Sequence, residues 1–349
     1  MKIKTINSII VNNPVPIESG TSGRYPLFID DGFLVFRVSG NRDEHISFGL
    51  LARVFPENYE TIRPHEHVIY EKLAIKKQDI LVDRMSNKPV CLLFHPKEEI
   101  TRLIKRGFDL GKRITHYTYE NHLYEYVICD RSDWVHELTM LLHDIPQMVI
   151  ADGHHRTAAY FSHRQENEDF GLFSALMSLD QVSVRSYHRK INLPGSVIVH
   201  FRTHLGEHYD VSPASEQHIR YLTKYGQPDD QSILVYHQQK WNRLDPKKPT
   251  SKIRSGSADL LHQFEQHFFQ PFCQMSDLNF NQYLEYISGS EIEMDNLHLD
   301  NTEFLFVFPA VDPKFLWDAS LRGEIMPAKS TWIEPRMLTD IIQVPHDYE

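Results

Sequence analysis

The chain has 349 residues, of which 41% are hydrophobic and 24% charged, as in an ordinary globular protein with room for one large or two smaller domains. Its formal net charge of −10, without any lysine- or arginine-rich run, argues against a general nucleic-acid binder. Because no apolar run approaches membrane-spanning length and the N-terminus lacks a long apolar stretch, we expect a cytoplasmic protein that binds small molecules and neither nucleic acid nor membrane.

The first half of the chain alternates between strand-like and helix-like segments. Predicted strands cover residues 33–38, 89–94, 124–128, a run that ends at Asp152, and 172–179. Predicted helices cover residues 97–110, 132–143 and 154–167. Within 132–143, Trp134, Leu138, Leu141 and Leu142 form a stripe that is typical of an amphipathic helix packed on a sheet.

The second half repeats this alternation less clearly. Predicted helices cover 214–225, 257–269 and 313–322, predicted strands cover 232–237 and 304–308, and the polar stretch 238–256 is predicted to be a loop. The alternation favours an α/β fold with a mixed sheet. We expect an N-terminal α/β domain over residues 1–200 and an additional C-terminal α/β domain over residues 201–349.

An apolar run stops abruptly at Asp152, and Gly153, His154, His155 and Arg156 follow at the predicted start of a helix. A helix N-terminus offers unpaired backbone N–H groups and a dipole that favours negative charge. Gly153 allows close backbone approach, and the guanidinium of Arg156 suits phosphate oxygens. The pattern predicts a phosphate-binding loop; the alternative is a tight turn with a solvated arginine.

Upstream, Pro64 stands where a helix could begin, which would place Glu66 in the first helical turn. A carboxylate there is either a complement to the helix dipole or a functional group. The neighbouring His65 and His67 could ligate a metal, but the His-Glu-x-x-His spacing of zinc peptidases is absent from this run.

Near the C-terminus, Lys329, Ser330 and Thr331 follow the predicted helix 313–322 and lie between prolines. A point charge beside two short hydroxyl donors can bind a carboxylate or a phosphate, although a solvated loop explains the same residues.

The cysteines and histidines give no further site. Cys91, Cys129 and Cys273 are scattered without paired spacing, which predicts neither a disulfide framework nor a thiolate zinc site. The 21 histidines invite a metal interpretation, but they are spread along the chain.

Three segments together carry a resemblance to a known family. Residues 63–73, Asp152–Arg156 and Pro327–Thr331 resemble segments of the free-serine kinases, which use a nucleotide to make O-phosphoserine and contain a ParB/sulfiredoxin-like α/β nucleotide-binding core. Over nearly its whole length the chain is still more similar to the DUF1015 family. Matching landmarks there are 65–66, 150–156, 187–189 and 326–331.

The resemblance implies a role for each of the three segments. Glu66 would be the general base on a substrate hydroxyl. Asp152, Gly153, His154, His155 and Arg156 would hold the phosphates of ATP or ADP, and Asp152 would also help to hold magnesium. Lys329, Ser330 and Thr331 would bind the anionic end of the acceptor. These roles suit phosphoryl transfer, which depends on positioning, charge neutralisation and a nearby base.

The chain differs from the serine kinases after Thr331, where Trp332 and Ile333 replace an Arg-His pair, and this favours a larger or less anionic acceptor. The leading hypothesis is a kinase of a small hydroxylated metabolite, with free serine as the first candidate. One alternative is a non-catalytic nucleotide- or phosphate-binding regulatory protein. A second alternative is a metal-dependent phosphohydrolase that uses His65, His67, His154 and His155.

Overall fold

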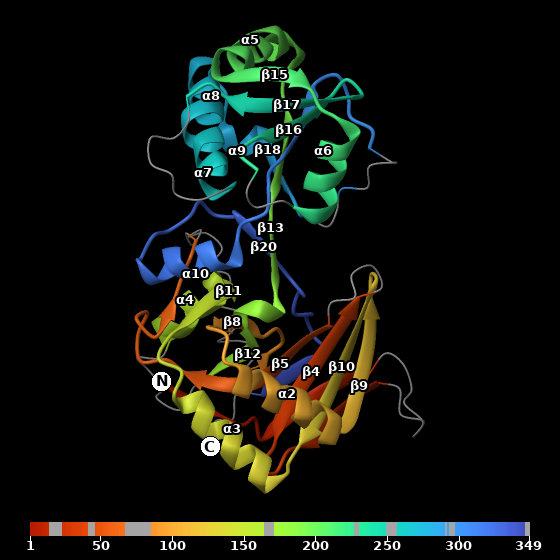
Figure 1. Cartoon of the computed structure of the whole chain (residues 1–349), viewed down its shortest axis with the longest axis vertical. Helices are drawn as coiled ribbons and strands as arrows, with labels where there is room; N and C mark the ends of the chain where they lie inside the picture. Colours follow the sequence, from red (N-terminus) through yellow and green to blue (C-terminus); the bar gives the residue numbers. More distant parts are fainter. Residues whose placement is uncertain are drawn as a thin grey trace. The chain divides into compact units, whose positions relative to one another are not determined.

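The computed structural model describes residues 1–13, 23–40, 46–66, 85–163, 171–226, 230–248, 257–289, 292 and 297–345. The chain forms two compact units (Figure 1): unit 1 comprises Met1–Ser183, Trp317–Ile325 and Pro335–Glu349, and unit 2 comprises Val184–Leu316 and Met326–Glu334. From the sequence we placed a single boundary near residue 200. In the structure the chain leaves unit 1 after Ser183, and two C-terminal segments belong to that unit again.

Unit 1 is built on a nine-stranded sheet. Its strands, in spatial order, are β6 (Ile62–Arg63), β11 (Met148–Asp152), β8 (Val90–Phe94), β12 (Leu172–Ser178), β5 (Ile46–Phe55), β4 (Phe33–Gly40), β10 (His122–Cys129) and β9 (Lys112–Tyr119), with β1 (Lys2–Lys4) paired to the end of β5. β6 and β11 are parallel, as are β8 and β12, and the other pairs are antiparallel. The fold is therefore the mixed-sheet α/β class that the sequence predicts.

Two helices of unit 1 pack against each other and on the sheet: α2 (Glu98–Leu110) and α3 (Ser132–His143) (Figure 1). Trp134, Leu138 and Leu142 of the predicted stripe are buried, and the Trp134 indole Nε1 donates to the Leu103 carbonyl at 2.8 Å. A Cβ on Gly107 would lie 2.1 Å from the Trp134 ring, so this glycine permits the close approach of the two helices. The third helix, α4 (His154–His163), follows β11 directly.

A second sheet in unit 1 has four strands, in the order β3 (Gly23–Phe28), β2 (Ser8–Asn13), β21 (Ile342–Pro345) and β7 (Met85–Ser86). β21 comes from the last part of the chain and pairs with β2 from the first part. β21 pairs with β2 and β7 over hundreds of residues, and such pairings of short strands carry little local sequence signal. None of the four was predicted.

Unit 2 is built on a six-stranded sheet in the order β15 (Tyr209–Pro213), β17 (Lys240–Pro246), β16 (Ile233–His237), β19 (Glu303–Val307), β14 (His188–Asn192) and β18 (Leu284–Ile287). A separate pair joins β13 (Ser183–Ser186) to β20 (Thr331–Glu334). The helices are α5 (Ile198–His208), α6 (Glu216–Arg220) with its extension to Tyr225, α7 (Ser257–His262), η4 (Gln263–Phe269), α8 (Gln270–Met275) and α9 (Phe280–Tyr283). The last helix of the chain, α10 (Pro313–Leu321), spans residues assigned to both units.

The two faces of the six-stranded sheet carry different helices. A phenylalanine-rich core fills the face under α5, η4 and α8, and Phe201 at its centre contacts Phe268, Phe272 and Phe304 with ring centroids 4.9–5.5 Å apart. Figure 1 shows α6 on the other side, where Leu222, Leu234 and Leu305 form a smaller core. Alternation along β16 explains the division, because Ile233 and Val235 point to the first core and Leu234 and Tyr236 to the second.

Two predictions from the sequence are wrong. β17 (Lys240–Pro246) lies inside the stretch predicted to be a loop, and its turn to β16 uses Gln238 and Gln239, both with positive φ. Two glutamines at a turn do not predict a hairpin, whereas Asn-Gly would. The helix predicted to begin at Pro64 is absent from residues 64–66, which follow β6 without helical structure; the rest of that predicted helix lies outside the described residues.

The remaining predicted helices and strands occur, although their ends shift. α4 is described as far as His163, and the last four residues of the predicted helix lie outside the described residues. Within the described part of the chain, no helix is both long and apolar enough to cross a membrane.

Candidate functional site

The turn between β11 and α4 has the geometry of a backbone anion site. Gly153 has φ +105°, and a Cβ there would lie 2.9 Å from Arg156 Nη2 and 3.0 Å from Val90 Cγ2. Glycine is thus required both by the backbone angle and by the space available. The Gly153 carbonyl accepts from the Thr157 N–H at 2.9 Å, so Gly153 lies directly at the N-terminus of α4.

Positive charge gathers beside this turn. The Asp152 carboxylate, whose side chain is 38% exposed, lies 3.1 Å from Arg156 Nη2 and 3.3 Å from Lys88 Nζ, both through Oδ2. Arg156 is fixed from behind, because its Nη1 donates to the carbonyls of Lys88 and Pro89 at 2.7 and 2.6 Å. These two neutral carbonyls hold the guanidinium in one orientation, and they do not neutralise its charge.

Arg336 is the third cation of the cluster, and it acts electrostatically on Asp152, Lys88 and Arg156. Burial alone would raise the pKa of Asp152, but these three cations hold it well below its ordinary value. Burial lowers the pKa of Lys88 and of Arg156, with Asp152 acting in the opposite direction on both. Three cations thus act on this one carboxylate, and an anion would complement their charge.

Glu66 lies at the end of a chain of contacts that joins the segment after β6 to β11 and α4. His65 Nδ1 donates to the Ile150 carbonyl at 2.6 Å, and the His65 N–H donates to His154 Nε2 at 3.4 Å. His154 Nε2 is then the acceptor nitrogen of that ring, and Nδ1, which carries the proton, lies 3.5 Å from Glu66 Oε1. The Glu66 side chain is only 15% exposed, and His154 orients it.

His65 and His154 are buried, with ring centroids 4.5 Å apart. Burial lowers the pKa of His65 to about 4, against the opposing effects of the Ile150 carbonyl and Asp152. His65 is therefore neutral near pH 7 and serves as a rigid support. Of the two histidines in the sequence-predicted phosphate site, His154 thus faces His65 and Glu66, whereas His155 is half-buried one residue later.

The predicted loop at residues 329–331 belongs to unit 2. Lys329 has φ +60°, and its Nζ lies 4.9 Å from the centre of the Tyr187 ring and 3.4 Å from the Tyr187 hydroxyl. The Trp332 ring meets the Tyr187 ring edge-on, with ring centroids 5.3 Å apart. Ser330 is fully buried and its hydroxyl donates to the Pro327 carbonyl at 2.6 Å, so Ser330 stabilises the turn itself.

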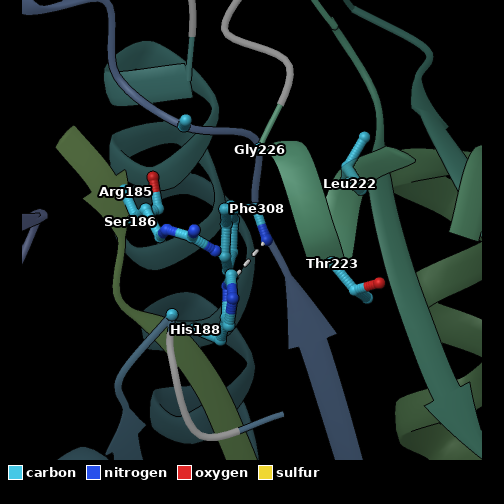
Figure 2. A pocket seen from close by; sticks show the side chains of 9 residues that line it. Arg185, Ser186, His188, Leu222, Thr223, Gly226 and Phe308 are labelled. Atoms are coloured by element: carbon cyan, nitrogen blue, oxygen red, sulfur yellow. Dashed lines mark hydrogen bonds between the residues drawn. The ribbon is translucent and has the colours of Figure 1, made fainter. Parts of the chain in front are cut away.

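Unit 2 also has a small hollow that includes His188, Thr223 and Gly226 (Figure 2). Its volume of about 10 Å³ suits a single water molecule and no metabolite. His188 Nδ1 accepts from the Phe308 N–H at 3.2 Å, the dashed contact in Figure 2. Burial, with Arg189 and Arg185 nearby, lowers the pKa of His188 to about 3, so this ring is a neutral structural acceptor.

A family model described as "Protein of unknown function (DUF1015)" matches residues 29–267. The chain belongs to this family. The matched region contains Glu66, the turn Asp152–Arg156 and the element Tyr187–Arg189, and it ends before Lys329.

Several solved structures resemble the chain distantly. SbnI with a C-terminal truncation from Staphylococcus aureus is 13% identical, with 85% of this chain and 87% of that chain covered and a TM-score of 0.45. A free serine kinase in complex with AMP is 14% identical, with 84% and 91% covered and a TM-score of 0.43. A mutant of free serine kinase in complex with ADP is 13% identical, with 85% and 93% covered and a TM-score of 0.42. None of the curated proteins matches the chain. Likeness at this level assigns no function to this chain.

The sequence offers Arg336 only as a substitute for the cations of the missing Arg-His pair, and it gives no signal for Lys88 or Thr157. Lys88 and Arg336 are far from residues 152–156 in the sequence. Thr157 is fully buried one turn into α4, and its hydroxyl lacks a hydrogen-bond partner among the described residues. His65 was noted only as a metal candidate. Its backbone position beside Glu66 is what makes it a support for His154.

Proposed function

We propose that the protein is a nucleotide-dependent phosphotransferase that acts on a small hydroxylated metabolite, with free serine as the first candidate acceptor. The observation that carries the proposal is the gathering of Lys88, Arg156 and Arg336 around Asp152, beside a helix N-terminus where Gly153 allows close approach. Phosphates of ATP or ADP suit such a site because both the charges and the backbone N–H groups favour them.

The chemistry requires a base, and Glu66 supports that role. The acceptor hydroxyl would give its proton to the Glu66 carboxylate while its oxygen attacks the terminal phosphorus of the nucleotide. The bond from phosphorus to the bridging oxygen would break and release ADP from ATP, or AMP from ADP. His154, which holds Glu66 at 3.5 Å, would keep the carboxylate oriented, so His154 is a positioning residue.

By the resemblance to the free-serine kinases, Asp152 would supply one carboxylate ligand to a magnesium ion. Its Oδ2 meets Lys88 and Arg156, and Mg²⁺ commonly takes one or two carboxylates together with substrate phosphates. When bound, the ion would neutralise charge on the phosphates. His155 would add a donor to the phosphates, and Lys329, Ser330 and Thr331 would serve the anionic end of the acceptor, as the resemblance to the free-serine kinases implies. Ser330 would act through the turn it closes.

The test is phosphorus NMR on the full chain with Mg²⁺, ATP or ADP, and pools of hydroxylated amino acids. The matched pair of variants is Glu66→Gln and Glu137→Gln, the second at an exposed position of α3. We expect a new phosphomonoester signal from the wild type and from Glu137→Gln. Its rate should fall by about 10²–10⁴ in Glu66→Gln, the typical contribution of a positioned base.

Three results would change the proposal. Full turnover by Glu66→Gln would remove the assigned base while leaving a kinase. Nucleotide left intact with every pool, together with measurable binding of ADP, would instead indicate a regulatory nucleotide-binding protein. A transition metal bound after purification would instead indicate the second alternative, a metal-dependent phosphohydrolase that uses His65, His67, His154 and His155, of which His67 lies outside the described residues.

A further inference from the structure

A group of metal-ligating side chains lies in unit 2, away from the residues used above. His204, Glu207 and His208 stand at i, i+3 and i+4 on α5, and one ligand atom of each lies within 4.8 Å of the other two. It is the only such set of three or more histidine, cysteine or acidic residues within the described parts of the chain. The same His-x-x-Glu-His spacing occurs in a class of zinc enzymes.

Hydrogen bonds prepare both histidines for a metal. His204 Nε2 faces the Phe268 carbonyl at 3.2 Å, and His208 Nδ1 faces the His204 carbonyl at 3.0 Å. A carbonyl only accepts, so each of these nitrogens carries the proton and donates it. The remaining nitrogens, His204 Nδ1 and His208 Nε2, are therefore the ones with free lone pairs. Metal-ligating histidines characteristically make this second bond to a carbonyl or carboxylate.

The packing around the group is asymmetric, as a metal site at a surface requires. The His204 ring is 5% exposed and stacks on Phe268, with centroids 5.1 Å apart and an angle of 16°. His208 is half-buried, and its ring centroid lies 4.3 Å from that of His204. The Glu207 side chain is 65% exposed, and its Oε2 lies 3.7 Å from His204 Nδ1. One ligand is thus fixed and another is free to adjust.

We propose that His204, Glu207 and His208 form a binding site for a divalent transition-metal ion, with Zn²⁺ as the ion best suited to two imidazoles and one carboxylate. Magnesium and calcium prefer oxygen ligands throughout, so they do not suit this group. The three side chains leave a fourth position for water. The site lies in unit 2, whereas the turn between β11 and α4 lies in unit 1. The metal proposal does not depend on the kinase proposal.

The change of geometry that the site needs is small. Zinc bonds of about 2.0–2.1 Å place tetrahedral ligand atoms roughly 3.3 Å apart. The group therefore has to contract from its present spread of up to 4.8 Å. Glu207 Oε2 already lies 3.7 Å from His204 Nδ1, so the half-buried His208 has to approach the other two. His204 can stay in place against Phe268, which links the ion to η4 through a hydrogen bond.

The test measures Zn²⁺ binding to the full chain, free of any purification tag, by competition with a chromophoric chelator. The variants are His208→Gln and Glu207→Gln, at half-buried and exposed positions that should not disturb folding. The control is His298→Gln, an exposed histidine next to Leu297 and Leu299, which pack on the other face of the sheet. It corrects for weak binding by scattered histidines in a chain that has 21 of them.

We expect one tight Zn²⁺ equivalent in the wild type and in His298→Gln, undisturbed by excess Mg²⁺. Each of the two site variants should weaken it at least tenfold, since even the loss of an outer hydrogen-bond partner costs about 10–100-fold in metal affinity. Co²⁺ in place of Zn²⁺ should give the visible spectrum of a tetrahedral site, and this spectrum should disappear in His208→Gln. Equal affinities of the wild type and both site variants, with circular dichroism unchanged, would overturn the proposal.

Discussion

Two arginine–carboxylate clusters, one in each unit, look similar by distance and differ in every other respect. In unit 1, Arg156 lies 3.1 Å from Asp152, whose side chain is 38% exposed, and Lys88 and Arg336 add two more positive charges. In unit 2, Arg189 lies 2.6 Å from Glu265, and the exposed fractions of the two side chains are 0% and 6%. The first cluster is partly exposed and has three cations around one carboxylate. The second is buried and has one charge of each sign.

The difference separates binding from packing. A buried pair has desolvated both charges and depends on their mutual attraction, so its main effect is on the stability and the unique arrangement of the fold. In a partly exposed cluster with several cations around one carboxylate, the cations can also attract an anionic ligand. By this criterion the landmark Tyr187–Arg189 is structural, since Arg189 stacks on Tyr286 and donates to the Tyr187 carbonyl. By the same criterion we expect the landmark Asp152–Arg156 to bind a ligand.

The largest expected effect is on the buried pair. Arg189→Met leaves the Glu265 carboxylate buried without its cation, which should cost about 3–5 kcal/mol in the free energy of unfolding. Urea denaturation followed by circular dichroism measures the loss. The double variant Arg189→Met, Glu265→Met should recover most of it, because an apolar pair of similar volume replaces the ion pair. An Arg189→Met protein as stable as the wild type would contradict the structural role.

This contrast also explains how far the sequence could predict the site. Gly153 and Arg156 were predictable because a strand end, a glycine and a helix start are adjacent in the sequence. Lys88 and Arg336 were not, because the pairings of β8 with β11 and of β2 with β21 bring distant segments into one unit. Glu66 was found by resemblance, but its helical setting was wrong and its partner His154 had been assigned to phosphate. A hydrogen bond between residues 65 and 154 has no local signature.

Each unit contains a buried histidine with a lowered pKa, so the stability of both units should depend on pH. Burial lowers the pKa of His65 in unit 1 to about 4 and that of His188 in unit 2 to about 3, from ordinary values near 6.5. The unfolded chain then binds more protons than the folded one below pH 6.5, so stability is lost as the pH falls. Between pH 7 and pH 5 each histidine should cost about 2 kcal/mol.

Thermal or urea unfolding at several pH values measures this slope. His188→Asn should flatten it, since the Asn carbonyl oxygen can take the Phe308 N–H in place of Nδ1 and does not titrate. The exposed His136→Gln is the control and should leave the slope unchanged. A slope that is the same in His188→Asn and in the wild type would show that His188 is protonated at the same pH in the folded and unfolded chains.

A smaller effect is expected at the partly exposed cluster. Gly153→Ala forces a side chain into φ +105° and brings its Cβ to 2.9 Å from Arg156 Nη2. The strain amounts to about 1–3 kcal/mol, and the displaced guanidinium should lower ADP affinity about tenfold in isothermal titration. Gly206→Ala, inside α5 with no atom within 4 Å of its new Cβ, should stabilise the protein slightly and leave ADP binding unchanged. Unaltered affinity in Gly153→Ala would argue against a phosphate at this turn.

The smallest expected effect concerns a buried polar atom that lacks a partner among the described residues, and there is one beside each cluster. In unit 2 it is Arg189 Nη2, and in unit 1 it is the hydroxyl of Thr157. Thr157→Val keeps the shape and removes only the unpaired hydroxyl, so unfolding should show equal or slightly greater stability, by up to about 1 kcal/mol. ADP affinity should stay the same if the hydroxyl is merely unsatisfied. A tenfold loss of ADP affinity with stability retained would instead mean that Thr157 contacts the ligand, and that the partly exposed cluster extends one helical turn deeper than its charges indicate.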